Sequence, residues 1–133
     1  MTVVAGEGIV IRNAHFPGRA PIDAYGNGGF RFAEMSHRGS ILCLPSGIHG
    51  WPPAAPAALA LADFERVFNE TETIEILLVG TGETLKPLPA ALRQAFRERG
   101  ISADPMSTGA AVRTYNVLLA EDRAVAAALV AVD

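Results

Sequence analysis

Four adjacent polar side chains interrupt an apolar segment in the last quarter of the sequence. The stretch MSTGAAVRTYNVLLAEDRAVAAAL carries Arg113, Thr114, Tyr115 and Asn116 between two alanine-rich runs. Burying such groups without hydrogen-bond partners costs roughly 1–3 kcal/mol each. They must therefore either meet specific partners inside the fold or face a ligand.

The spacing of these residues supports two interpretations. Arg113 and Asn116 lie three residues apart, so on a helix they share a face, and Glu121 and Arg123 follow within the next turns. One interpretation is a buried network of ion pairs and hydrogen bonds that holds this helix to its neighbours. The other is a polar pocket in which Arg113 receives a carboxylate or a phosphate. We favour the network, and neither interpretation supplies a general base.

A glycine turn follows the most apolar run of the sequence and precedes a predicted helix, the place where α/β folds bind ligands. The backbone N–H groups of this turn, Gly80-Thr81-Gly82, could face an anion. The dinucleotide fingerprint, however, needs a glycine where Leu85 stands, and the phosphate-loop motif is absent. A structural turn is therefore favoured over a ligand-contacting loop. The candidate ligand site comprises Gly80, Thr81, Gly82, Met106, Thr108, Arg113 and Asn116.

Other reactive residue types do not form a recognisable catalytic or metal-binding pattern. His15, His37 and His49 are far apart in the sequence and have no partner at ligand spacing, so we expect no metal. Ser46 lies near His49, but the glycine-rich serine elbow of a nucleophilic triad is missing. Cys43 sits in an apolar run and is expected to be a core residue. We predict no catalytic residue and no cofactor.

An aromatic residue in a proline-rich stretch is the candidate for partner binding. Trp51 lies between Gly50 and two prolines, where it is expected to cover the core beneath a loop. The alternative is an exposed anchor for a protein partner, formed by Trp51 together with Ile48.

Composition excludes some classes of protein. Half of the 133 residues are hydrophobic, 19% are charged and the formal net charge is −3, which favours a compact fold and argues against nucleic acid as a partner. The single cysteine suits a reducing compartment. The N-terminal MTVVAGEGIVIRN does not resemble a signal peptide, and the longest apolar stretch, Ala54–Ala62, is too short to span a membrane. We expect one soluble, cytoplasmic domain over residues 1–133, with no second domain or linker.

The first half of the sequence predicts β-structure. Short apolar runs at Ile9–Ile11 and Ser40–Leu44 and alternating residues around position 22 and Phe30–Phe32 are typical of strands. The YGNGGF motif at Tyr25–Phe30 predicts a hairpin turn. Pro45–Pro56, with four prolines, is expected to be a loop.

The middle of the sequence predicts a strand–helix–strand unit. Asp63 is expected to N-cap a short helix. Ile74–Gly80 is an almost continuous apolar run typical of a strand buried on both faces. A helix over Ala90–Arg99 and a strand over Ile101–Pro105 follow, which predicts a parallel pair joined by a right-handed crossover.

The C-terminal segment is ambiguous from its residues alone. Thr108 can N-cap a helix that runs to about Leu119, and residues 121–123 are expected to form a turn. The run from Ala124 to Val132 is compatible with either a helix or a strand of small residues.

Two motifs carry a resemblance to a known family. LLVGTG (Leu77–Gly82) and the long segment Met106–Leu129 resemble small single-domain proteins of unknown function that include the mitochondrial complex I (NADH dehydrogenase alpha-subcomplex) assembly factor 3 and an adipogenesis-associated animal protein. The likeness extends to the Tyr25–Phe30 turn, to Ser40–Pro45 and to Trp51.

The resemblance implies an α/β fold of three layers, in which a central mixed sheet with one antiparallel strand is flanked by helices and an extra β-hairpin. It implies a helix over Thr108–Leu119 and a closing strand over Val125–Val132. It also implies that Arg113, Thr114 and Asn116 anchor the helix near Gly80–Gly82. No catalytic residues are carried over.

Two hypotheses about function follow. The first is a non-enzymatic interaction or assembly protein, with a protein partner in a respiratory or other membrane-associated complex. The second is a domain that binds a small ligand or an anion, with a site between the Gly80–Gly82 turn and the Arg113/Asn116 helix.

Overall fold

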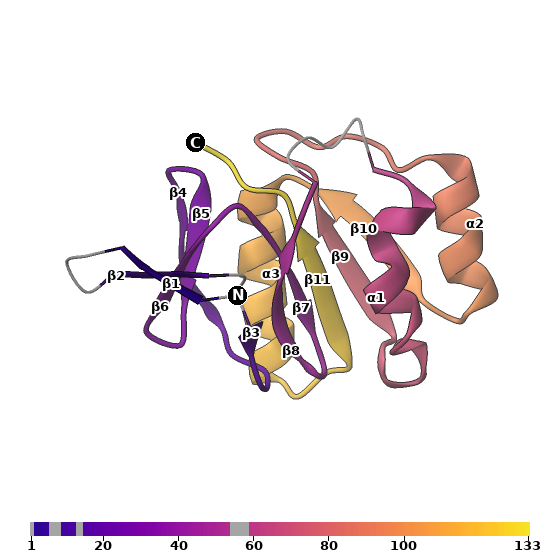
Figure 1. The fold of residues 1–133 in the computed structure, drawn as a ribbon. Helices are drawn as coiled ribbons and strands as arrows, with labels where there is room; N and C mark the ends of the chain where they lie inside the picture. The colour runs from indigo at the N-terminus through magenta and orange to yellow at the C-terminus, as the bar shows by residue number, and fades with distance from the viewer. Residues whose placement is uncertain (1, 6–8, 13–14, 54–58) are drawn as a thin grey trace.

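A computed structural model describes residues 2–5, 9–12, 15–53 and 59–133, and the side chains of residues 16–53 and 59–133 (Figure 1). Its strands are β1 (Thr2–Ala5), β2 (Ile9–Arg12), β3 (His15–Phe16), β4 (Ile22–Gly26), β5 (Gly29–Phe32), β6 (Met35–Arg38), β7 (Ser40–Leu44), β8 (Gly47–Trp51), β9 (Ile76–Gly80), β10 (Ser102–Met106) and β11 (Val125–Leu129). Its helices are α1 (Glu65–Phe68), α2 (Ala90–Glu98) and α3 (Thr108–Ala120), with 3-10 helices η2 (Leu61–Phe64) and η3 (Thr71–Thr73).

The central sheet has the strand order β10-β9-β11-β7-β8, extended at one edge by the two-residue β3. β9 is parallel to both of its neighbours, β10 and β11, as its continuous apolar run predicts. β7 runs antiparallel to β11 and to β8, so it is the one reversed strand among these five. The mixed sheet implied by the family resemblance is confirmed.

A second, antiparallel sheet of three strands, β4-β5-β6, lies over one face of the central sheet. The hairpin between β4 and β5 turns at Asn27 and Gly28, whose φ angles are 53° and 78°. Positive φ at both central residues matches the twist of the flanking strands, so the turn predicted from YGNGGF is confirmed. The extra hairpin is thus the first part of a three-stranded sheet.

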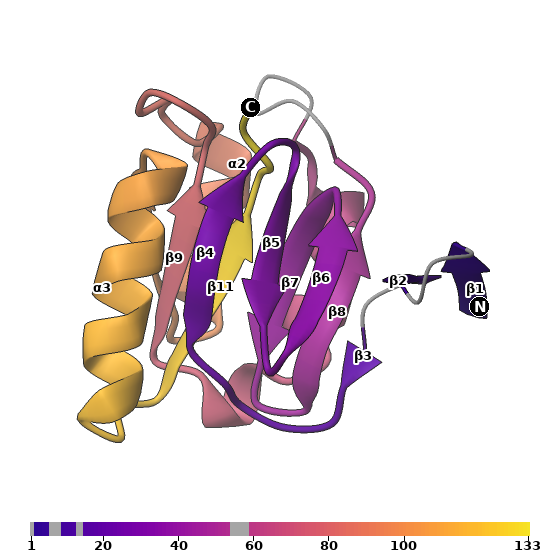
Figure 2. The same ribbon diagram turned by 90° about the vertical axis from the view of Figure 1, so that its left-hand side faces the viewer.

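Three layers result (Figure 2). α3 and the β4-β5-β6 sheet cover one face of the central sheet, and α1 and α2 cover the other. β7 separates two apolar cores because successive side chains point to opposite faces. Leu42 and Leu44 pack with Phe64 and Phe96 on the α1/α2 side, whereas Cys43 packs on the α3 side.

The alanines of β11 let both layers approach the middle of the sheet. Ala126 and Ala128 belong to the core on the α1/α2 side, and Ala127 belongs to the core on the α3 side. All three are 0% exposed. The segment that was compatible with either a helix or a strand is therefore a strand, although it ends at Leu129, three residues before the expected end.

Most of the predicted elements are confirmed: the strands at 9–12, 40–44, 76–80 and 102–106, and helices α2 and α3. The loop expected over Pro45–Pro56 is wrong in part, because Gly47–Trp51 forms β8 and pairs along its whole length with β7. Residues 54–56 of that stretch lie outside the described residues.

Two predicted N-caps are also wrong. Asp63 lies inside η2, and its carboxylate accepts a hydrogen bond from the backbone N–H of Ala60. Ser107, not Thr108, caps α3, because its hydroxyl accepts from the N–H of Ala110 at 3.3 Å. Thr108 is instead the first helical residue and is fully buried.

Candidate functional site

The carboxyl ends of the parallel strands β9, β10 and β11 meet at the Gly80–Gly82 turn. Thr108, the first residue of α3, lies beside this turn. Its hydroxyl donates to the carbonyl of Val130 at 2.7 Å and accepts from the N–H of Gly82 at 3.0 Å. Its backbone N–H donates to the carbonyl of Gly82 at 2.7 Å. One buried side chain thereby ties the turn to the segment that follows β11.

The N–H and hydroxyl groups of Thr81 also have partners within the chain. Thr81 donates its N–H to the carbonyl of Met106 at 2.8 Å, and its hydroxyl accepts from the N–H of Lys86 at 2.9 Å. Gly80 has no room for a side chain, because a Cβ there would lie 2.9 Å from the Cα of Thr108. The turn is closed by the fold itself.

Asn116 joins α3 to the edge of the second sheet. Its side-chain oxygen accepts from the N–H of Ile22 and its amide nitrogen donates to the carbonyl of Ile22, both at 2.9 Å. The amide thus takes the place of a neighbouring strand at the free edge of β4. Asn116, one of the four adjacent polar residues at 113–116, therefore has hydrogen-bond partners inside the fold.

Arg113 lies on the same side of α3, close to Gly109 and to the hydroxyl of Tyr25. Its side chain is exposed, so it is not part of a buried network. The structure brings Gly80, Thr81, Gly82, Met106 and Thr108 together, whereas Arg113 and Asn116 face β4.

Ile48 and Trp51, the candidate partner-binding residues, are both buried. Ile48 is 0% exposed and Trp51 is 5% exposed. The indole of Trp51 packs edge-on against Phe64, with ring centroids 5.2 Å apart, and its Nε1–H donates to the carbonyl of Asp63 at 2.6 Å. Trp51 therefore covers the core, while one edge of it still reaches a cleft.

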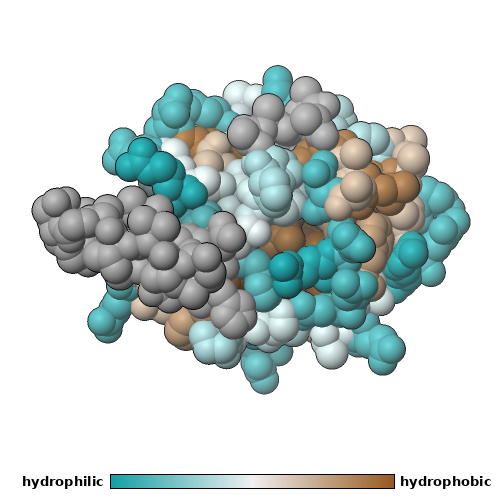
Figure 3. Space-filling view, viewed as in Figure 1, coloured by the Kyte–Doolittle hydropathy of each residue, from teal (hydrophilic) through white to brown (hydrophobic). Residues whose placement is uncertain are grey.

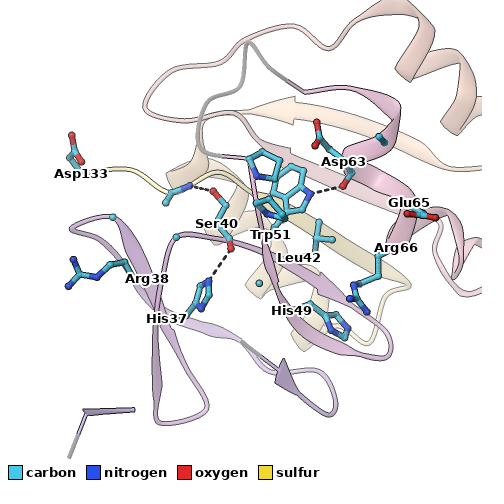
Figure 4. Close-up of a pocket in the computed structure, with 17 residues that line it drawn as sticks. His37, Arg38, Ser40, Leu42, His49, Trp51, Asp63, Glu65, Arg66 and Asp133 are labelled. Atoms are coloured by element: carbon cyan, nitrogen blue, oxygen red, sulfur yellow. Dashed lines mark hydrogen bonds between the residues drawn. The ribbon is translucent and has the colours of Figure 1, made fainter. Parts of the chain in front are cut away.

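This cleft has a volume of about 1050 Å³ and lies between β6 on one side and β8 with η2 and α1 on the other (Figure 4). Leu42, His49 and Trp51 are among the residues that line it, with Arg38 and Arg66 from β6 and α1. On the face of the molecule shown in Figure 3, hydrophilic side chains predominate and apolar ones gather toward α1 and α2.

The cleft as a whole is not predictable from the sequence. Its walls come from segments near residues 38, 50, 65 and 131, and no local pattern joins them. The one available signal was the proximity of Ser46, His49 and Trp51 in the sequence.

A serine and a histidine do meet beside the cleft. The hydroxyl of Ser46 lies 3.0 Å from Nε2 of His49, and it also donates to the carboxylate of Glu70. The serine hydroxyl is in the middle of this chain of hydrogen bonds, whereas a triad needs the histidine in the middle. Glu70 additionally accepts from the N–H of Ser46, so the cluster fastens the β7–β8 turn to the segment after α1.

Cys43 is a core residue, as predicted. It is 0% exposed, and burial raises the pKa of its thiol far above the ordinary value. Burial likewise raises the pKa of the Tyr115 hydroxyl, which forms a hydrogen bond with the thiol. Both groups stay protonated at neutral pH, and the thiol is not a nucleophile there.

Residues 22–130 match the family described as "Protein of unknown function (DUF498/DUF598)". The chain belongs to this family. The match begins at β4 and includes the central sheet apart from β3, together with the Gly80–Gly82 turn and α3.

Relatives cover most of the chain. An uncharacterised protein of Rhodobacter capsulatus is 40% identical over 118 residues, which are 89% of this chain and 90% of that protein. The mouse NADH dehydrogenase [ubiquinone] 1 alpha subcomplex assembly factor 3 is 30% identical over 92% of this chain and 66% of its own length, so the chain spans about two thirds of that relative.

A solved structure described as an outer membrane protein from Bartonella henselae is 65% identical, with a TM-score of 0.87 over 90% of this chain and all of that one. Within the residues that the structure describes here, no helix is long and apolar enough to cross a membrane. Among the same residues, no group of three or more histidine, cysteine or acidic side chains could hold a metal ion.

Proposed function

We propose that this chain is a non-enzymatic, protein-binding domain that assists the assembly of NADH dehydrogenase or another membrane-associated respiratory complex. The observation that carries this proposal is the 30% identity to a complex I assembly factor over 92% of the chain. Assembly is the role that the name of that relative states, and its transfer to this chain is our inference.

The chemistry of the predicted site supports a binding role over catalysis. The hydroxyls of Thr81 and Thr108 and the amide of Asn116 are all engaged by backbone groups of the chain itself. The alternative, a small-ligand site between the Gly80–Gly82 turn and the Arg113/Asn116 helix, has less support because those groups are engaged. We infer that the protein acts in the cytoplasm, where its buried thiol would remain reduced.

Exposed apolar side chains offer contacts for a partner. Tyr25, Leu61, Leu85 and Val117 are 43–58% exposed and lie on β4, on η2, after the glycine turn and on α3, respectively. These are the positions at which photo-crosslinking residues should be placed, one at a time.

The proposal is tested by deleting the gene in its source organism and measuring assembled NADH dehydrogenase by native gel electrophoresis of membranes. We expect the assembled complex to fall and subassemblies to accumulate, with restoration by the plasmid-borne chain. Crosslinking from Val117 or Leu85 should capture a subunit of the complex. Normal assembly in the deletion strain, with no subunit captured from any of the four positions, would refute the proposal.

A further inference from the structure

The cleft between β6, β8 and α1 combines an apolar floor with a cationic group at one end. Leu42 and Trp51 line the floor, and Arg66 and His49 also line the cleft and are drawn at its end nearest α1 (Figure 4). Clefts of this size that mix apolar lining with a few convergent polar groups are typical of small-ligand sites.

The floor is rigid. Leu42 is 2% exposed within the fully buried strand β7. Trp51 is fixed by its hydrogen bond to the carbonyl of Asp63 and by its edge contact with Phe64. An apolar group that enters the cleft would therefore meet a preformed surface, and no side chain of the floor would have to be ordered at a cost in affinity.

The cationic group is available for a ligand. Arg66 is exposed and extends toward His49, and within the described part of the chain no hydrogen bond or ion pair engages its guanidinium. A guanidinium can hold a carboxylate or a phosphate through two parallel hydrogen bonds.

Acidic side chains lie along and beside the cleft as well. The carboxylate of Asp63 accepts from the N–H of Ala60. Asp133 lies at the far side of the cleft, whereas Glu65 is drawn beside Arg66 (Figure 4). Glu70 accepts a hydrogen bond from the hydroxyl of Ser46, which lies 3.0 Å from Nε2 of His49. At this end Arg66 is the group that can hold an anion, so the anionic part of a ligand would lie against Arg66 and its apolar part over Trp51.

We propose that this cleft binds a small amphipathic anion, with a carboxylate or phosphate head held by Arg66 and an apolar body lying over Leu42 and Trp51. This site is distinct from the Gly80–Gly82 turn and does not depend on the assembly function proposed above. If the ligand test fails, the proposed assembly function still stands, because assembly does not require a small ligand.

The experiment uses Trp51 as its own reporter, because it is the only tryptophan of the chain. Tryptophan fluorescence is titrated with three probes: octanoate, which has head and body; octanol, which has the body alone; and acetate, which has the head alone. Each titration is repeated with Arg66→Gln, with Arg66→Lys and with the control Arg93→Gln, which removes an exposed arginine from α2. The thermal midpoints of all variants are compared first.

We expect octanoate to change the fluorescence saturably, and octanol and acetate to bind at least about tenfold more weakly, since each lacks one of the two interactions. Arg66→Gln should weaken octanoate binding at least about tenfold, whereas Arg66→Lys, which keeps the charge, should weaken it less and Arg93→Gln should leave it unchanged. The proposal is overturned by any of three results: no saturable change with octanoate, equal binding of octanol and octanoate, or unaltered octanoate binding by Arg66→Gln.

Discussion

Replacing Asn116 by alanine tests whether the polar cluster on α3 is architectural. The substitution removes both hydrogen bonds between the side chain and the backbone of Ile22, each 2.9 Å long. Ile22 is 3% exposed, so its N–H and C=O groups would lose their partners in a place with little access to water. No other side chain needs to move, because alanine fits wherever asparagine does.

The magnitude follows from these two bonds. Each is worth about 0.5–1.5 kcal/mol net, and a stranded buried group costs somewhat more, so Asn116→Ala should destabilise the fold by about 2–3 kcal/mol. At this chain length that corresponds to a fall in Tm of about 10 °C. Urea unfolding followed by Trp51 fluorescence should show a lower midpoint with an unchanged m value.

Arg113→Ala is the matched control, since Arg113 lies one turn earlier on the same helix and is exposed. It should change the free energy of unfolding by no more than about 0.5 kcal/mol. If both variants unfold at the same urea concentration, the amide of Asn116 does not hold β4 to α3, and the architectural explanation is wrong.

Three further predictions concern the turn and the core. Thr108→Val should cost about 2–4 kcal/mol in urea unfolding, because the N–H of Gly82 and the C=O of Val130 lose their partner, whereas Thr108→Ser should cost about 1 kcal/mol. Gly80→Ala should cost about 1–3 kcal/mol in the same assay, since its Cβ would lie 2.9 Å from the Cα of Thr108; an unchanged midpoint would contradict the close approach. Burial raises the pKa of the Cys43 thiol, so above the unfolded-state pKa of about 8.5 the unfolded chain releases a proton that the folded chain keeps. The free energy of unfolding should therefore be fully retained below that pH and fall above it, by up to about 1.4 kcal/mol per pH unit. The slope between pH 8 and about 10 should be shallower in Cys43→Ala, and an equal slope would argue against this linkage.

The elements that the sequence predicted well are those whose signals are local. β9 is a continuous apolar run bounded by a turn, and α2 has a leucine–phenylalanine pair one turn apart and a glycine at its end. β8 was missed because its sequence, GIHGW, contains two glycines and follows a proline. Its strand conformation comes from pairing with β7 over five residues, which is a tertiary signal.

The site was harder to predict than the fold for the same reason. The three-residue spacing of Arg113 and Asn116 correctly placed them on one side of a helix. The sequence could not say that this side meets β4, since Ile22 is 94 residues away from Asn116. The cleft depends on still more distant segments, and Arg66 at one end of it belongs to no motif that the sequence shows.

The way the chain closes its sheet explains why the cleft, and not the glycine turn, is the better place to look for a ligand. In open α/β sheets, ligands bind outside the carboxyl ends of the parallel strands. Here the segment after β11 crosses those ends: the N–H of Val130 donates to the carbonyl of Gly80 at 2.9 Å, and the N–H of Ala131 donates to the hydroxyl of Ser40 at 2.9 Å. The carbonyl of Gly80 and the N–H groups of Thr81 and Gly82 are therefore engaged by the chain itself. Strand β7, reversed relative to its neighbours, carries the sheet on to β8. There, between β6 and α1, the fold leaves a cavity lined by the guanidinium of Arg66, which has no hydrogen bond or ion pair to the described residues.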